Sequence, residues 1–216
     1  MKKSVTLGIL NIGVVATTLF SGNAWAHHLM EGRVPSTLFE GFASGLAHPV
    51  IGLDHFAFVI AVGLLSAIMT SRRWLAPSIF IGATVLGVAV HLLSVNLPVV
   101  EELVALSVVA GGVLLLERSY NVRAVLALAG IAGIFHGYAY GEAIVGAEPA
   151  PLFAYLLGFA AIQWIICMAA AFAGAKVLLD KEAFGTKWQA VPTLVAGAVI
   201  ALAGVLAFTG NLPELL

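Results

Sequence analysis

Two histidines and an aspartate, His48, Asp54 and His55, lie within one apolar stretch whose sequence begins His-Pro-Val-Ile-Gly-Leu-Asp-His. Ionisable side chains are costly inside a membrane, and those found there are usually functional. Imidazole and carboxylate groups together form a ligand set for first-row transition metals such as nickel, cobalt, copper and zinc. The stretch therefore predicts metal chemistry at one end of a membrane segment. The alternative is an interhelical hydrogen-bond network.

The two histidines could bind one metal ion together only if the helix between them is broken. In a straight helix, His48 and His55 would be about 10 Å apart along the axis. Metal–ligand bonds of about 2 Å could not join both side chains to one ion at that separation. Pro49 and Gly52 lie between them, and both residue types weaken a regular helix. We therefore expect a broken or re-entrant start, with residues 36–47 forming a short segment at the outer surface.

A second polar element, Phe-His-Gly-Tyr-Ala-Tyr-Gly-Glu, ends at Glu142. His136 and Tyr140 share one face of a helix because they are four residues apart. The intervening glycines permit close approach of another backbone. We predict His136 and Glu142 as metal-site residues, and Tyr140 as a wall or hydrogen-bond donor rather than a ligand.

Further candidates for the same site each have a structural alternative. His91 is either a site residue or an interhelical histidine. Glu101 and Glu102 either reach the site or are solvated residues of a helix N-terminus, where the helix dipole favours acids. His27 and His28 would follow a cleaved leader, where a free α-amine and two imidazoles could capture metal.

The composition predicts an all-α membrane protein. The chain has 216 residues, of which 61% are hydrophobic and 10% charged, whereas soluble domains have roughly 25% charged residues. The formal net charge of −1 offers no basic field for nucleic acid. Its length leaves no room for a soluble domain beside several spans.

The first residues have the features of a cleaved signal peptide. Lys2 and Lys3 precede an apolar run over 5–20, and Ala24-Trp25-Ala26 forms a cleavage site flanked by small residues. We expect residues 1–26 to be removed, which leaves 27–216 as a single six-helix domain. The alternative is an uncleaved first membrane helix.

Six apolar stretches are long enough to cross a bilayer of about 30 Å. They lie near 47–70, 75–95, 99–117, 122–145, 152–176 and 189–210. The loops on one side carry seven basic residues: Arg72, Arg73, Arg118, Arg123, Lys176, Lys181 and Lys187. The other side has only Arg33, so the positive-inside rule places both mature termini in the periplasm. This orientation brings the membrane histidines and most membrane acids to a similar depth near the outer face.

Together, HPVIGLDH and FHGYAYGE resemble motifs of the HupE/UreJ family of nickel/cobalt permeases, over essentially the whole chain. The resemblance implies secondary uptake of Ni²⁺ or Co²⁺ across a bacterial inner membrane. It also implies that His48, Asp54 and His55 are essential, and it extends to His136 and Glu142. One departure is Tyr140, which stands where many members have a second histidine.

We predict a permease rather than an enzyme, with a metal ion as substrate, the bilayer as surroundings and no prosthetic group. One alternative is an intramembrane hydrolase in which His48, His55, His136 and Asp54 hold zinc and Glu142 is the general base. Against it, the chain has no Gly-x-Ser-x-Gly motif. A metal sensor or accessory membrane protein is the other alternative.

The orientation is testable with reporter fusions. A reporter fused after Leu216 should read as extracytoplasmic, and one inserted near Glu182 as cytoplasmic, because the basic loops stay inside. A cytoplasmic C-terminus would mean that one of the six spans is wrong, with the segment before His48 the first to reconsider.

Overall fold

The computed structural model describes residues 33–117, 121–179 and 191–212. The expected signal peptide and its cleavage site, with His27 and His28, lie outside these residues. The described part is helical, with no strand among its elements. Its elements are α2 (Leu38–Ile51), α3 (Leu53–Ser66), η2 (Ala67–Arg72), α4 (Leu75–Leu92), α5 (Val100–Leu116), α6 (Val122–Gly141), η3 (Glu142–Ile144), α7 (Pro149–Leu179) and α9 (Val191–Phe208). The all-α prediction is confirmed for these residues.

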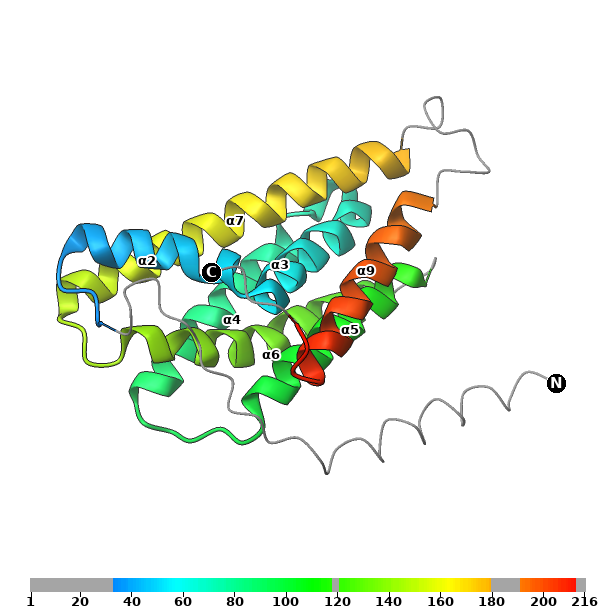
Figure 1. The fold of residues 1–216 in the computed structure, drawn as a ribbon. Helices are drawn as coiled ribbons and strands as arrows, with labels where there is room; N and C mark the ends of the chain where they lie inside the picture. The colour runs from blue at the N-terminus through cyan, green and yellow to red at the C-terminus, as the bar shows by residue number, and fades with distance from the viewer. Residues whose placement is uncertain (1–32, 118–120, 180–190, 213–216) are drawn as a thin grey trace.

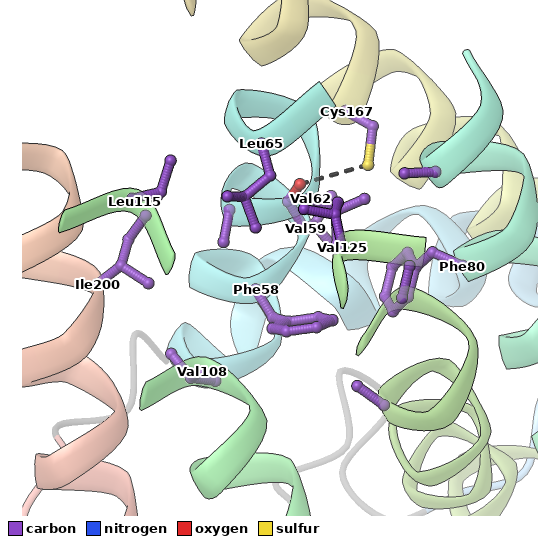
Figure 2. Packing of buried hydrophobic residues seen from close by; sticks show 14 of the residues in the cluster. Phe58, Val59, Val62, Leu65, Phe80, Val108, Leu115, Val125, Cys167 and Ile200 are labelled. Atoms are coloured by element: carbon purple, nitrogen blue, oxygen red, sulfur yellow. Dashed lines mark hydrogen bonds between the residues drawn. The ribbon is translucent and has the colours of Figure 1, made fainter. Parts of the chain in front are cut away.

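The helices pack mainly as three pairs: α4 with α6, α2 with α7, and α5 with α9 (Figure 1). Helix α3 lies among them and contacts members of all three pairs. Phe58, Val59 and Val62 of α3 are therefore almost completely buried. Figure 2 shows Phe58, Val62 and Leu65 surrounded by side chains from the neighbouring helices. The first sequence motif thus leads into the most enclosed helix of the bundle.

The predicted break between the two histidines is present. Helix α2 ends at Ile51, α3 begins at Leu53, and the two are bent by 82°. Pro49 lies inside α2 and does not end it. The break is at Gly52, whose backbone is extended with φ −71° and ψ 107°. The first expected span, 47–70, is therefore not one straight helix. The short segment expected over 36–47 is the larger part of a helix that continues to Ile51.

Helix α2 begins where the sequence provides a cap for its free N–H groups. The Thr37 hydroxyl accepts a hydrogen bond from the Glu40 backbone N–H at 3.1 Å. The Glu40 carboxylate in turn accepts from the backbone N–H groups of Ser36 and Thr37. This reciprocal arrangement satisfies donors that a helix start leaves unpaired.

Four helices are long and apolar enough to cross a membrane, and the bent α2–α3 pair adds a fifth if it counts as one span. The four are Leu75–Leu92, Val122–Ile144, Pro149–Val177 and Val191–Phe208. The remaining expected span, the third at 99–117, corresponds to α5, whose 17 residues extend only about 26 Å at 1.5 Å per residue. The structure therefore supports a membrane protein with four or five spans by length and composition alone.

Glycines allow α4 and α6 to lie almost backbone to backbone. Gly133, Gly137 and Gly141 recur every fourth residue of α6 and face α4, a spacing typical of close helix contacts in membranes. A Cβ added at Gly137 would overlap the Thr84 carbonyl oxygen, and one at Gly141 would be 2.7 Å from the His91 Cβ. This contact fixes the depth and rotation of α6, and hence the position of His136.

We expect Gly137→Ala to destabilise the protein by about 1–3 kcal/mol or more, because backbone atoms of α4 would have to move. Gly130→Ala on the same helix is the matched control, since its added Cβ would meet only Ile79 Cγ2 at 3.5 Å. Thermal unfolding in detergent would measure both variants. Equal melting temperatures for the two would contradict the proposed backbone contact.

Candidate functional site

The structure brings together two histidines that are far apart in the sequence. The Nδ1 atoms of His55 and His136 lie 2.7 Å apart, a hydrogen-bond distance, and the ring centroids are separated by 4.8 Å. His55 lies in the first turn of α3, directly after the break, whereas His136 lies near the end of α6. The predicted meeting of the first and second motifs is present.

Contacts on every side hold the His136 ring, which is completely buried. Its Nε2 lies 2.9 Å from the Ser107 hydroxyl oxygen of α5. The Phe58 ring stacks on it with a centroid distance of 4.6 Å and an interplanar angle of 21°, and the edge of Phe80 closes another side at 5.9 Å. The imidazole is thus fixed in both position and rotation.

His48 reaches the same cluster because the chain turns at Gly52. Its ring centroid lies 6.4 Å from that of His55, whereas a straight helix would separate the residues by about 10 Å along its axis. Tyr140 contacts both imidazoles, at 5.2 Å from His48 and 4.5 Å from His55. Tyr140 therefore forms a wall of the cluster, as the sequence predicts.

Tyr140 is held through its backbone rather than through its hydroxyl group. The Tyr155 hydroxyl donates a hydrogen bond to the Tyr140 carbonyl oxygen at 2.9 Å, and Phe159 packs on the Tyr140 ring at 5.4 Å. The Tyr140 hydroxyl is buried and has no hydrogen-bond partner. A buried polar atom of this kind costs free energy unless something else satisfies it.

Asp54 lies beside His55 at the start of α3. Its Oδ1 accepts a hydrogen bond from the His55 backbone N–H at 2.7 Å. A Cβ at Gly52 would lie 2.8 Å from His55 Cδ2 and 3.2 Å from Asp54 Oδ1. Gly52 thus gives both side chains their space as well as providing the turn.

Acidic side chains lie near one end of the cluster. Glu101 is close enough to His55, Asp54, Glu142 and Glu102 for their charges to interact. Glu101, Glu102 and Glu142 are exposed, the first two in the opening turn of α5 and the third directly after α6. They form a negative rim beside the buried imidazoles, which is favourable for a cation.

His91 occupies a different position. Its ring packs against Tyr138 with a centroid distance of 4.4 Å, and its Cβ lies against Gly141. Its Nδ1 is buried without a hydrogen-bond partner. Within the described helices it has no ring contact with His48, His55 or His136, so its participation stays a prediction.

No group of three or more His, Cys, Asp or Glu side chains could hold a metal ion within residues 33–117, 121–179 and 191–212. The cluster consists instead of the His55–His136 pair, the His48 imidazole beside His55 and Tyr140, and nearby carboxylates. Simultaneous coordination by these groups would require side chains to move.

Sequence reasoning missed three residues that shape the cluster: Phe58, Ser107 and Tyr155. Ser107 was the easiest to find, because it is a lone hydroxyl in the middle of an apolar helix, where polar groups commonly bond across to a neighbouring helix. Phe58 and Tyr155 gave no such signal, since aromatic residues are common in any helical core.

Comparison with known proteins agrees with the sequence motifs. The family described as HupE / UreJ protein matches residues 15–207. The Protein HupE of Rhizobium leguminosarum bv. viciae is 31% identical over 177 residues, which cover 79% of this chain and 86% of that protein. No solved structure matches.

Two tyrosine substitutions separate the roles of the buried hydroxyl groups. Tyr155→Phe should lower stability by about 0.5–1.5 kcal/mol, because it removes the hydrogen bond to the Tyr140 carbonyl. Tyr140→Phe should leave stability unchanged or raise it, since its hydroxyl has no partner to lose. Thermal unfolding of the detergent-solubilised protein measures both. A larger loss in Tyr140→Phe would show that its hydroxyl is satisfied after all.

Proposed function

Because the chain belongs to the HupE/UreJ family, which is associated with nickel and cobalt transport, we propose that it is a permease carrying Ni²⁺ or Co²⁺ inward across the bacterial inner membrane. The observation that carries the proposal is the cluster at the break between α2 and α3. There His55 contacts His136 and lies next to Asp54, with His48 nearby. Imidazole and carboxylate ligands suit both metals.

The cation first meets the negative rim. Exposed Glu101, Glu102 and Glu142 raise its local concentration, and Asp54 offsets part of its charge as it loses water. His48, Asp54 and His55 then replace part of its hydration shell. Tyr140 contacts both imidazoles and forms one wall of the space beside them.

Loose ligand placement suits transport better than storage. A permeating ion must bind strongly enough to enter and weakly enough to leave. A few ligands that come together only transiently satisfy this requirement, whereas a closed four-ligand cage would retain the ion. The membrane potential supplies about 2.3 kcal/mol per charge per 100 mV, or roughly 4.6 kcal/mol for a divalent cation moving inward.

The proposed topology has six spans. The bent α2–α3 pair would supply the first and α5 the third, with both mature termini in the periplasm after removal of residues 1–26. The broken helix supports this arrangement, because an irregular backbone is tolerated at membrane depth where other helices or a polar cavity surround it. The rim and the imidazoles would then face the periplasm.

Substitution of the first motif tests the function. We expect His48→Ala, Asp54→Asn and His55→Ala each to lower Ni²⁺ and Co²⁺ uptake into sealed vesicles by more than about tenfold. Because they would contact one ion, double substitutions should cost little more than the worst single one. Competition between Ni²⁺ and Co²⁺ in the same assay would establish the preferred ion.

The matched control is Glu117→Gln, which removes a carboxylate at the end of α5 opposite Glu101 and Glu102 and should leave uptake unchanged. Membrane insertion of every variant is checked by its amount in the membrane fraction. Wild-type uptake by Asp54→Asn would exclude this carboxylate from the transport path, and absence of uptake by the wild-type protein would overturn the function.

A further inference from the structure

A chain of hydrogen bonds leads from the backbone of α5 to the imidazole at the start of α3. The Ser107 hydroxyl lies 2.7 Å from the Val104 carbonyl oxygen and 2.9 Å from His136 Nε2. His136 Nδ1 lies 2.7 Å from His55 Nδ1. The side chains of Ser107, His136 and His55 are all buried. Three helices are thus joined by one polar chain inside an apolar core.

The hydrogen bond between Ser107 and the Val104 carbonyl determines which atoms donate and which accept in all the others. A carbonyl oxygen can only accept a hydrogen bond, and a serine hydroxyl has one proton to donate. At 2.7 Å from the Val104 oxygen, the Ser107 proton must lie on that bond, because two oxygens without a proton between them would repel. Ser107 is then an acceptor toward His136, so His136 Nε2 carries the proton and donates.

The donor and acceptor roles at His136 determine those at His55. A charged imidazolium is costly at a completely buried position, so His136 is neutral and its Nδ1 has a lone pair. That lone pair accepts from His55, which must therefore carry its proton on Nδ1. The consequence for His55 is a free lone pair on Nε2, the nitrogen that faces away from His136.

We propose that Ser107 and His136 are positioning residues that hold His55 in the tautomer whose Nε2 can bind the metal ion. The proposal rests on the function proposed above and changes the role of His136 within it. Both nitrogens of His136 are occupied by hydrogen bonds, so it has no lone pair for a metal. Metal-binding histidines commonly donate their other ring N–H to a neighbouring group, which fixes tautomer and orientation.

The packing supports a fixed rather than an adaptable His136. Phe58 stacks on one face of the ring, and Phe80 lies edge-on to it. Rotation to present a nitrogen to an ion would break this stacking and both hydrogen bonds. His55 is less enclosed, at 8% exposure compared with 0% for His136, so an ion can reach it more easily.

The tautomers can be read directly, without any transport assay. Long-range ¹H–¹⁵N spectra of the metal-free, full-length protein with ¹⁵N-labelled histidine distinguish Nδ1–H from Nε2–H forms. We expect the Nδ1–H form for His55 and the Nε2–H form for His136, with signals assigned from His55→Gln and His136→Gln. The opposite form at His55, with its proton on Nε2, would overturn the proposal.

Uptake measurements test the consequence for the metal. Ser107→Ala should raise the half-saturating Ni²⁺ concentration by about 10- to 100-fold, and Ser107→Thr, which keeps the hydroxyl, should restore most of the affinity. Ser66→Ala is the matched control, because Ser66 is also buried and its hydroxyl bonds the Val62 carbonyl within its own helix. It should leave the half-saturating concentration unchanged.

Glutamine at position 136 distinguishes a positioning residue from a ligand. Its amide can accept from His55 Nδ1–H and donate to Ser107 Oγ, which preserves the direction of the chain. His136→Gln should therefore retain at least about tenfold more uptake than His55→Gln. Equal loss in the two variants would make His136 a ligand and overturn the proposal.

The experiments distinguish a failure of the proposed function from a failure of the tautomer proposal. If vesicles with the wild-type protein took up neither Ni²⁺ nor Co²⁺, the proposed transport function would be wrong. The tautomers of His55 and His136 would still show which atoms donate and which accept in the hydrogen bonds. Expected tautomers with unchanged affinity in Ser107→Ala would overturn the link between the chain and the metal.

Discussion

The chain turns by 82° at Gly52, and the arrangement of the candidate site depends on this turn. It directs α2 against α7 and α3 into the middle of the bundle, where α3 contacts all three helix pairs. It also brings His48 within ring contact of His55. A side chain at position 52 would collide with His55 and approach the Asp54 carboxylate, so one residue provides both the turn and the space beside it.

Close contact between backbones keeps the other half of the site in place. Glycines of α6 approach α4 so closely that a methyl group would collide with main-chain atoms. Such contacts replace the hydrophobic effect, which gives little drive to association between helices in lipid. Because α6 cannot rotate or slide against α4, His136 is held at the depth of the break. A mobile α6 would not maintain a 2.7 Å contact between His136 and His55.

Buried polar atoms of the described helices fall into two groups with different energetic consequences. Those of Ser107, His136 and His55 are joined in one chain of hydrogen bonds. In contrast, the Tyr140 hydroxyl, His91 Nδ1 and Gln163 Oε1 are buried without a partner. Each such atom costs roughly 1–3 kcal/mol. The paired group is suited to hold one histidine in place, and of the unpaired atoms only the Tyr140 hydroxyl belongs to a residue that contacts the described cluster.

The sequence alone determined the class of protein and the residues to examine. Its composition predicted helices in a membrane, Pro49 and Gly52 between His48 and His55 indicated a break, and the two motifs indicated the family. These inferences succeed because apolar length, helix pitch and ligand chemistry are local properties. The sequence predicted six spans, whereas the described helices supply four or five by length and composition, because α5 has only 17 residues and the first span is bent.

Only the tertiary structure decided which groups meet. Sequence reasoning included His136 but could not show that both its nitrogens are occupied, because that depends on Ser107 of another helix. It grouped His91 with the other histidines by depth, whereas the rotation of α4 directs its ring to Tyr138. Depth along a membrane helix can be read from the sequence. The direction in which a side chain points depends on how each helix packs against the next, and a single sequence does not specify that packing.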